Sequence, residues 1–209
     1  MTRTRSVLFA LVAALALLGS GADASAAPAP LSSQTFTHQQ RVRPVTAAGV
    51  DAPGYTVART FHGATCSPGS DQVRGAYRCF AGNDIFDPCW AEAAAAPQVL
   101  CLLRPWAHVV YRLQVKGSLT ATPAGGPQPV WGLTVAGGNR CVEIDAARDR
   151  FDGRSVNYAC SYGLVVLGAV NDTHRVWTVA TARFAHGHYT LTGTRTVVTA
   201  WFARPSIHV

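Results

Sequence analysis

Six cysteines are the residues of this chain with the widest choice of chemistry, because thiols can hold zinc, act as nucleophiles or form disulfides. They are Cys66, Cys79, Cys89, Cys101, Cys141 and Cys160. Zinc sites use close pairs such as Cys-x2–4-Cys, whereas even the closest pair here, Cys79 and Cys89, is wider. A catalytic cysteine normally leaves an odd thiol, and this count is even. The cysteines therefore predict disulfides, not a metal site or a thiol nucleophile.

The spacing of the cysteines favours bridges between neighbours in sequence. Six cysteines allow fifteen pairings, and the favoured set is Cys66 with Cys79, Cys89 with Cys101, and Cys141 with Cys160. The last two end expected strands joined through a turn at 152–153, a geometry that brings Cα atoms into bridging range. Each bridge would close a short loop and is expected to stabilise the fold by ~3 kcal/mol.

Carboxylates could supply acid–base chemistry, but they are scarce and fall in two groups: Asp84 with Asp87, and Glu143 with Asp145, Asp149 and Asp152. A glycosidase needs two carboxylates across a cleft, and no spacing here selects a pair. Asp87 is instead expected to cap a helix, and Asp149 and Asp152 to occupy turns. For a hydrolase with dispersed residues, the first suspects are Asp84, Asp145, Asp149 and His108.

Other catalytic motifs are absent from the sequence. It has no Gly-x-Ser-x-Gly elbow, no His-Glu-x-x-His and no phosphate-cradling glycine loop. His186 and His188 could place two imidazoles on one side of a strand as metal ligands, but no third ligand is evident, and a solvent-facing loop is the favoured interpretation. We therefore expect no cofactor and no metal, and a non-enzymatic protein is favoured.

Five tryptophans offer a means of stacking on sugar rings. Trp177 and Trp201 lie inside regular strand patterns and are expected in the core. Trp90, at the start of an expected helix, and Trp106, after Arg104-Pro105, are the candidate ligand-stacking residues, with core packing as the alternative.

The first residues have the three parts of a secretory signal. Arg3 and Arg5 give a basic start, residues 7–18 form an apolar run, and Ala24-Ser25-Ala26 offers a small-x-small cleavage site. The apolar run is shorter than the ~20 residues that cross a bilayer, and no later segment approaches that length. We expect cleavage after Ala26, no transmembrane segment in the mature chain, and a protein that is secreted or associated with the cell wall.

The chain is basic, with 18 Lys and Arg against 11 Asp and Glu and a formal net charge of +7. Its single lysine, Lys116, and its arginines are spread along the chain, whereas a nucleic-acid footprint clusters on one element. Nucleic acid is therefore not an expected partner. Positive charge does favour anionic wall polymers, so the expected partners are cell-wall polymers or another envelope protein.

The elements that must position these residues are mostly strands. Alternating apolar residues bounded by turn signals predict strands at 99–103, 108–115, 130–135, 140–144, 156–160, 163–167, 176–184 and 196–202. In the segment 176–184, Trp177, Val179 and Thr181 share one face. One short helix is expected near 88–96, because Asp87 can cap it, Pro88 suits its first position and an alanine-rich run follows.

These elements define a mainly β, disulfide-stapled single domain, a sandwich or an irregular barrel with one short helix. Residues 27–54 are rich in Ala, Pro and Thr and are expected to form a flexible lead. Residues 55–209 are long enough for one domain with a real core.

The cysteine blocks resemble those of a known group of proteins. Tyr77-Arg78-Cys79, Gly82-Asn83, Asp87-Pro88-Cys89, Val99-Leu100-Cys101, Arg140-Cys141 and Tyr158-Ala159-Cys160 are similar to the signature of an uncharacterised family of secreted or membrane-tethered six-cysteine proteins from actinobacteria. The resemblance spans residues 66–177. It implies export, disulfides and a common fold, and it brings no activity and no catalytic residues. The serine-bearing loop at 67–70 departs from the family pattern in register.

The favoured function is therefore an exported, non-catalytic binding or structural module of the cell envelope with an undefined ligand. The alternative is a secreted hydrolase acting on wall glycans or peptides. A third interpretation is a protease inhibitor that presents the polar loop 67–75 on a disulfide scaffold.

Overall fold

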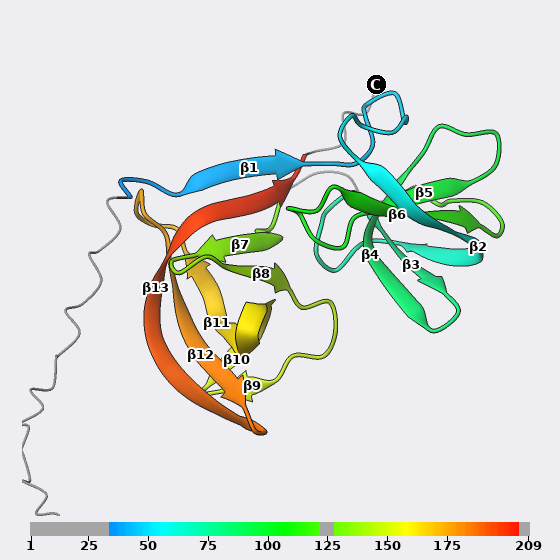
Figure 1. Cartoon of the computed structure of the whole chain (residues 1–209). Coiled ribbons are helices and arrows are strands. Elements are labelled where there is room, and N and C mark those ends of the chain that lie inside the picture. The colour runs from blue at the N-terminus through cyan, green and yellow to red at the C-terminus, as the bar shows by residue number, and fades with distance from the viewer. Residues whose placement is uncertain (1–33, 122–127, 205–209) are drawn as a thin grey trace, which may run out of the picture. The chain divides into compact units, whose positions relative to one another are not determined.

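The computed structural model describes residues 34–121 and 128–204, which form two β-sheets (Figure 1). The expected signal peptide at 1–26 lies outside the described residues, as do 27–33, 122–127 and 205–209. All described residues belong to one compact unit. Within them, no helix has the length and apolarity that crossing a membrane requires.

The first sheet is a closed barrel of five strands. Consecutive strands pair antiparallel, and the first strand closes the barrel by pairing in parallel with the last. Apolar side chains including Phe86, Val99 and Leu113 form its main core cluster. The strands are β2 (Thr56–Pro68), β3 (Tyr77–Ala81), β4 (Asp84–Ala91), β5 (Gln98–Cys101) and β6 (Val109–Val115).

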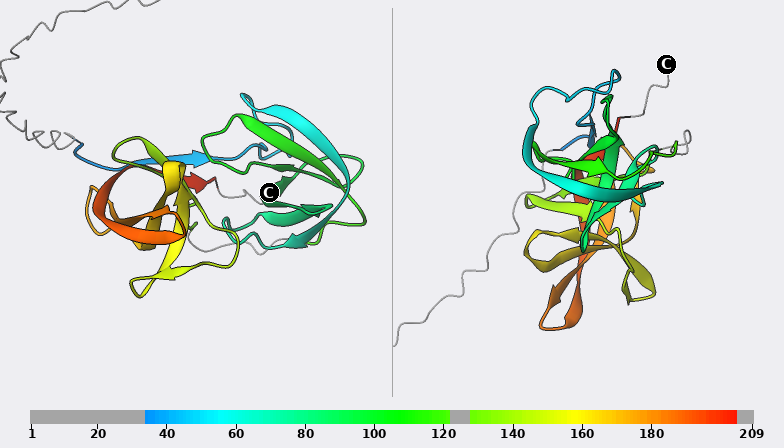
Figure 2. Two further views of the ribbon diagram at one scale, coloured as in Figure 1. Left: turned by 60° about the horizontal axis from the view of Figure 1, so that its bottom comes forward. Right: turned by 90° about the vertical axis from the view of Figure 1, so that its right-hand side faces the viewer.

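The second sheet has eight strands and is also curled (Figure 2). Pairing of β13 with β7 closes it into a ring, to which β1 adds in parallel along β13, and β9 pairs with β10. Its strands are β1 (His38–Val42), β7 (Gly132–Val135), β8 (Asn139–Glu143), β9 (Arg150–Phe151), β10 (Arg154–Cys160), β11 (Leu164–Asn171), β12 (Thr178–Ala185) and β13 (His188–Ala203). A single 3-10 turn, η1 (Ser161–Gly163), joins β10 to β11.

The structure confirms the mainly β fold, and each strand predicted from alternation overlaps an observed one. Trp177, Val179 and Thr181 are all buried, as their shared face predicts. Asp152 and Gly153 adopt φ of 52° and 71° in the turn between β9 and β10, a conformation typical of a tight hairpin. Of the two architectures left open by the sequence, the barrel is the one observed.

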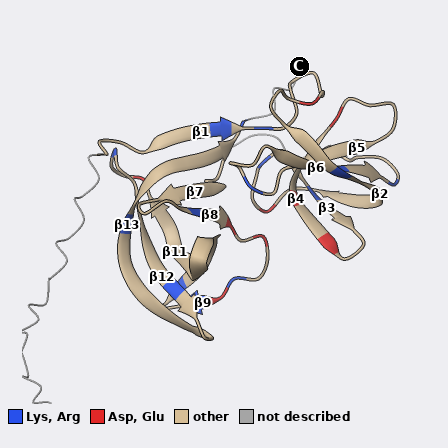
Figure 3. Ribbon diagram, viewed as in Figure 1, with Lys and Arg blue, Asp and Glu red and all other residues tan. Residues whose placement is uncertain are grey.

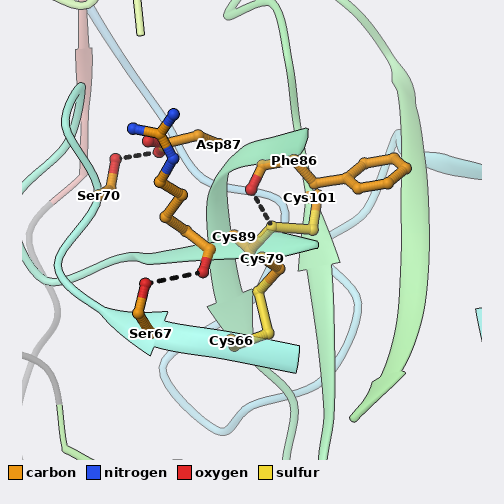
Figure 4. The surroundings of a disulfide bond; sticks show 9 residues. Cys66, Ser67, Ser70, Cys79, Phe86, Asp87, Cys89 and Cys101 are labelled. Carbon is orange, nitrogen blue, oxygen red and sulfur yellow. Dashed lines mark hydrogen bonds between the residues drawn. A yellow bond between two sulfur atoms is a disulfide. The ribbon is translucent and has the colours of Figure 1, made fainter. Parts of the chain in front are cut away.

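All three expected disulfides are present: Cys66–Cys79, Cys89–Cys101 and Cys141–Cys160. Each joins residues that lie directly opposite one another on paired antiparallel strands. Figure 4 shows the first two side by side in the five-stranded barrel, where β3 and β4 also pair with each other. The bridges therefore fix the register of three strand pairs, in the way that the spacing predicts.

The prediction of a helix near 88–96 is wrong. Residues up to Ala91 belong to β4, which pairs with β3 on one side and β5 on the other, and the 3-10 turn η1 is the only helical element among the described residues. The Asp87–Pro88 peptide bond is cis. Asp87 caps no helix: it is 2% exposed and accepts hydrogen bonds from the Ser70 hydroxyl and the Asp71 amide. Pairing with two strands holds residues 88–91 extended, and the rest of the alanine-rich run, 92–96, lies in the loop between β4 and β5.

The flexible lead expected at 27–54 also needs correction over its described part. Residues 38–42 form β1 beside β13, and Val45 is 2% exposed within an apolar cluster. Asp51 forms an ion pair with Arg112 of β6 at 2.7 Å. The folded part of the chain therefore begins well before residue 55. Parallel pairing with a strand 161 residues away leaves no signal in the composition of the segment.

One apolar cluster unites residues from both sheets. It includes Trp90 of β4, Trp131 before β7 and Ala203 of β13, and the rings of Trp90 and Trp131 meet edge to face at 5.9 Å between centroids. Trp131 donates its indole N–H to Gln72 at 2.9 Å, and Gln72 donates to the carbonyl of Glu143 at 2.6 Å. The two sheets thus share a core cluster and a buried hydrogen-bond chain.

Candidate ligand-binding groove

A groove of about 490 Å³ contains the one predicted stacking residue that solvent can reach. We call it the Trp106 groove. Its polar and aromatic lining comes from the loop between β5 and β6, from the β7–β8 hairpin and from η1. The lining residues are Arg104, Trp106, Gly138, Arg140, Val142, Ala159, Cys160, Ser161 and Tyr162.

Trp106 is held on the outer face of the second sheet by a glycine. A Cβ atom on Gly132 would lie 2.6 Å from Cγ of Pro105 and 3.2 Å from Cζ3 of Trp106, so only glycine admits this contact. Trp201 meets Trp106 edge to face at 6.4 Å between centroids. One side of the Trp106 ring is therefore fixed by packing, while the residue stays half-buried at the groove.

Arginines flank this ring. In β8 the side chains alternate, so that Cys141 is fully buried, whereas Arg140 and Val142 face the groove. The Arg140 guanidinium lies 5.7 Å from the centroid of the Trp106 ring, a cation–π distance. Arg104 comes from the same turn as Trp106, closed by a hydrogen bond from the Ala107 amide to the Arg104 carbonyl at 2.9 Å.

Tyr162 is presented to solvent by a turn in an unusual conformation. Its side chain is 87% exposed and its φ is 58°, a region that bulky residues rarely adopt. Arg183 donates to the Tyr162 carbonyl at 2.9 Å, and a Cβ on Gly163 would lie 2.6 Å from the Phe184 carbonyl oxygen. Backbone strain of this kind persists where its surroundings enforce it, and it is often found at functional sites.

The structure separates the two predicted stacking residues. Trp90 is 1% exposed in the shared core, so the prediction that it stacks on a ligand is wrong. Trp106 remains a candidate because it lines the groove. Trp177 lies in the core as expected, whereas Trp201 is only partly buried and packs against Trp106 instead of joining the core clusters.

The structure brings together carboxylates from the two acidic groups of the sequence. Burial raises the pKa of Asp87 to about 7, with a smaller contribution from repulsion by Asp145 and opposition from Ser70 and Arg78. Burial also raises the pKa of Glu143, which pairs with Arg148 at 2.9 Å and is repelled by Asp87. Asp87 is almost fully buried, so it holds the loop at 69–75 and does not face a substrate.

Ser70 is the centre of that loop (Figure 4). Its hydroxyl donates to Asp87 and accepts from the amides of Gln72 and Val73 at 3.1 and 2.9 Å. Gln72 and Val73 are 4% and 1% exposed. Side chains that turn inward in this way do not fit the exposed, extended loop of a protease inhibitor.

The four hydrolase suspects have different neighbours. Asp84 lines a separate hollow in the five-stranded barrel, the His108 ring lies 6.1 Å from that of Tyr55, and Asp149 accepts from the Tyr189 hydroxyl at 2.7 Å. The charge of Asp145 repels that of Asp87. Over residues 34–121 and 128–204, no hydrogen bond or ion pair joins any two suspects. In the same ranges, no three His, Cys, Asp or Glu side chains gather as a metal site would require.

Further hollows lie elsewhere among the described residues. One of about 580 Å³ lies over the loop at 69–75 and Gln128. Another, of about 330 Å³, is lined by Arg59, Asp84 and an aromatic group that includes Phe61 and Tyr111. The Phe61 and Tyr111 rings pack in the barrel core cluster, so this hollow is an extension of that core towards solvent.

Sequence reasoning missed Arg104, Arg140 and Tyr162 as parts of a site. The alternation around Cys141 could have placed Arg140 on the outer face of its strand. Nothing local in the sequence reveals that Gly132 lies beneath Trp106, since these residues come from different sheets.

Comparison of the chain with protein-family models, with curated proteins and with solved structures finds no match. The function must therefore be argued from the site itself.

Proposed function

We propose that this protein is an extracellular, non-catalytic binding module of the cell envelope, and that the Trp106 groove is its ligand site. The ligand class is a saccharide of a wall or envelope polymer, stacked on Trp106 and Tyr162. We include in this proposal export through the signal at 1–26 and membership of the actinobacterial six-cysteine family that the sequence resembles. Three disulfides are compatible with an extracellular location.

The main support for the proposal is the solvent exposure of the Tyr162 ring. An aromatic ring that is 87% exposed on a strained turn contributes little to the core, and a second aromatic ring, Trp106, lines the same groove. Aromatic faces with polar neighbours are typical of sites that bind amphipathic ligands.

Co-sedimentation with purified bacterial wall polymers tests the proposal. We expect saturable retention of the mature, oxidised protein, at least tenfold weaker for Trp106→Ala and for Tyr162→Ala. Phe184→Ala is the control, because Phe184 is 44% exposed on the β12–β13 hairpin and does not line the groove. Absence of saturable retention, or equal losses in all three variants, would contradict the proposal.

The alternative of a secreted hydrolase lacks an assembled site in the described residues, because its suspects have separate neighbours. A screen of glycan, ester and peptide substrates with Asp84→Ala and His108→Ala separates the two classes of protein. Turnover that either substitution abolishes would favour the hydrolase over the binding module.

A further inference from the structure

We infer that the Trp106 groove selects an anionic saccharide, whose ring stacks on Trp106 or Tyr162 while its carboxylate or phosphate is bound by Arg104 and Arg140. This inference rests on the proposed function and adds the charge of the ligand to it.

Lys and Arg residues occur on both sheets (Figure 3), and the charge of the groove has one sign. Its lining includes two arginines and no aspartate or glutamate. The hollow of the five-stranded barrel gives a contrast within the same molecule, because its lining contains both Arg59 and Asp84. A concave site lined by one sign of charge raises the local concentration of ligands of the opposite sign.

The two guanidinium groups are not neutralised by the protein. The ion pairs of the described chain are made by Arg78, Arg112, Arg148 and Arg154. Arg104 and Arg140 form none of them, and their side chains make no hydrogen bond to the described residues. Both groups are therefore available to an anion of the ligand.

The positions of the arginines suit an anion attached to a stacked ring. The Arg140 guanidinium lies over the Trp106 ring, 5.7 Å from its centroid, so an anion bound to Arg140 lies beside Trp106, in the groove that Tyr162 also lines. Arginine presents a planar fork of N–H donors that matches a carboxylate or a phosphate in two-point contact. Lysine would lack that geometry, and no lysine lines the groove.

The volume also fits a small segment of a polymer. About 490 Å³ lies within the range of ~300–1,000 Å³ that is typical of small-molecule sites. Uronic-acid sugars and sugar or polyol phosphates share the required chemistry, a hydroxylated body with one anionic group per unit. The experiment distinguishes these two sources of the anion.

The test is a titration of the oxidised protein with three probes, followed by intrinsic tryptophan fluorescence and calorimetry. The probes are a uronic-acid trimer, the neutral trimer of the parent sugar and a glycerol-phosphate trimer. The variants are Trp106→Ala, the double variant Arg104→Gln/Arg140→Gln, and the control Arg175→Gln/Arg204→Gln. The control removes the same charge from two exposed arginines outside the groove.

We expect at least one anionic trimer to bind tenfold or more tightly than the neutral trimer, and the groove double variant to abolish this preference. The anionic probe that binds more tightly identifies the source of the anion. Neutral and anionic trimers that bind equally, through Trp106, would overturn the inference and leave the proposed function standing. Equal losses in both double variants would also overturn it, by showing non-specific attraction. Failure of all three probes, together with absence of retention on wall polymers, would overturn both proposals.

Discussion

Tyr162 and Asp87 each occupy an environment that their residue type rarely adopts. Tyr162 combines a left-handed backbone with an almost fully exposed ring, and Asp87 is a carboxyl group with 2% exposure. The conformation of Tyr162 exposes its side chain to solvent, whereas the buried Asp87 holds a loop in place through Ser70. Burial and backbone conformation therefore distinguish a residue available to a ligand from one that maintains the fold.

The buried carboxyl of Asp87 predicts a pH-dependent stability. Its pKa rises from 3.8 to about 7 in the folded protein, so the folded state holds this proton more tightly than the unfolded chain does. Between these values the contribution of Asp87 to the free energy of unfolding falls as pH rises, by at most ~1.4 kcal/mol per pH unit. Asp87→Asn should gain stability relative to wild type over this window.

Urea unfolding at pH 4, 5, 6, 7 and 8 checks this prediction. The measured quantity is the difference in unfolding free energy between Asp87→Asn and wild type at each pH. Asp84→Asn is the control, since Asp84 is an exposed residue of the same strand. A difference that is independent of pH would show that Asp87 is not protonated near neutrality in the folded state.

A second prediction at the residue scale concerns the turn that presents Tyr162. Gly163→Ala places a Cβ 2.6 Å from the Phe184 carbonyl oxygen at a φ of +69°, whereas Gly153→Ala has a φ of +71° with nothing within 4 Å. Both should lose ~1 kcal/mol from backbone strain. Only Gly163→Ala should lose more than ~1 kcal/mol of stability. This variant alone should also lose retention on wall polymers. Chemical denaturation and co-sedimentation of both variants provide the comparison, and equal effects would contradict the account.

At the scale of elements, pairing between strands decides structure more than local preference does. The alternating segments became strands because their period matches burial on one face, as Trp177, Val179 and Thr181 show. In β2 the pairing register with β6 shifts twice, at Val57/Arg59 and at His62/Ala64. Such irregularities interrupt the period of two, so the sequence gives no clear signal for this strand. In β4, pairing with two neighbours replaces the first part of the expected helix, residues 88–91, and the remainder lies in a loop.

The disulfides allow an element-scale prediction. Replacing Cys141 and Cys160 by serine should lower the free energy of unfolding by ~3 kcal/mol and weaken retention on wall polymers, because Cys160 lines the groove and directly precedes η1. Replacing Cys66 and Cys79 should lower stability by a similar amount and leave retention unchanged. Urea unfolding and co-sedimentation at a temperature where both variants are folded are the measurements. Equal retention by the two variants would contradict the placement of the ligand site.

At the scale of the whole molecule, residues distant in sequence meet in the shared core and at the Trp106 groove. Composition and alternation could predict a mainly β fold, the bridges and Trp106 as one member of the site, but left a sandwich and a barrel as alternatives. They could not predict the groove, because Arg104 and Trp106 follow β5, whereas Arg140 lies in β8 and Tyr162 follows β10. The contact through Gly132 that brings these segments together depends on the folded structure alone.

The buried hydrogen bonds of Gln72 link the two sheets, so we predict that the sheets unfold together. Gln72→Ala removes the acceptor of the Trp131 indole and the donor to the Glu143 carbonyl, and should lower the free energy of unfolding by ~1–3 kcal/mol. Gln128→Ala is the control, because among the described residues the Gln128 side chain hydrogen-bonds to Arg74 alone, at a more exposed position. Tryptophan fluorescence and far-ultraviolet circular dichroism should report one coincident transition in each protein. Separate transitions in wild type would contradict a shared core.

Nuclear magnetic resonance mapping can locate a bound ligand at the Trp106 groove. We predict that titration with the anionic trimer shifts the indole N–H signal of Trp106 and the backbone amides of Arg140, Ser161 and Tyr162, while the indole signal of the buried Trp90 is unchanged. Shifts confined to the hollow at Arg59 and Asp84, or to the loop at 69–75, would contradict the account.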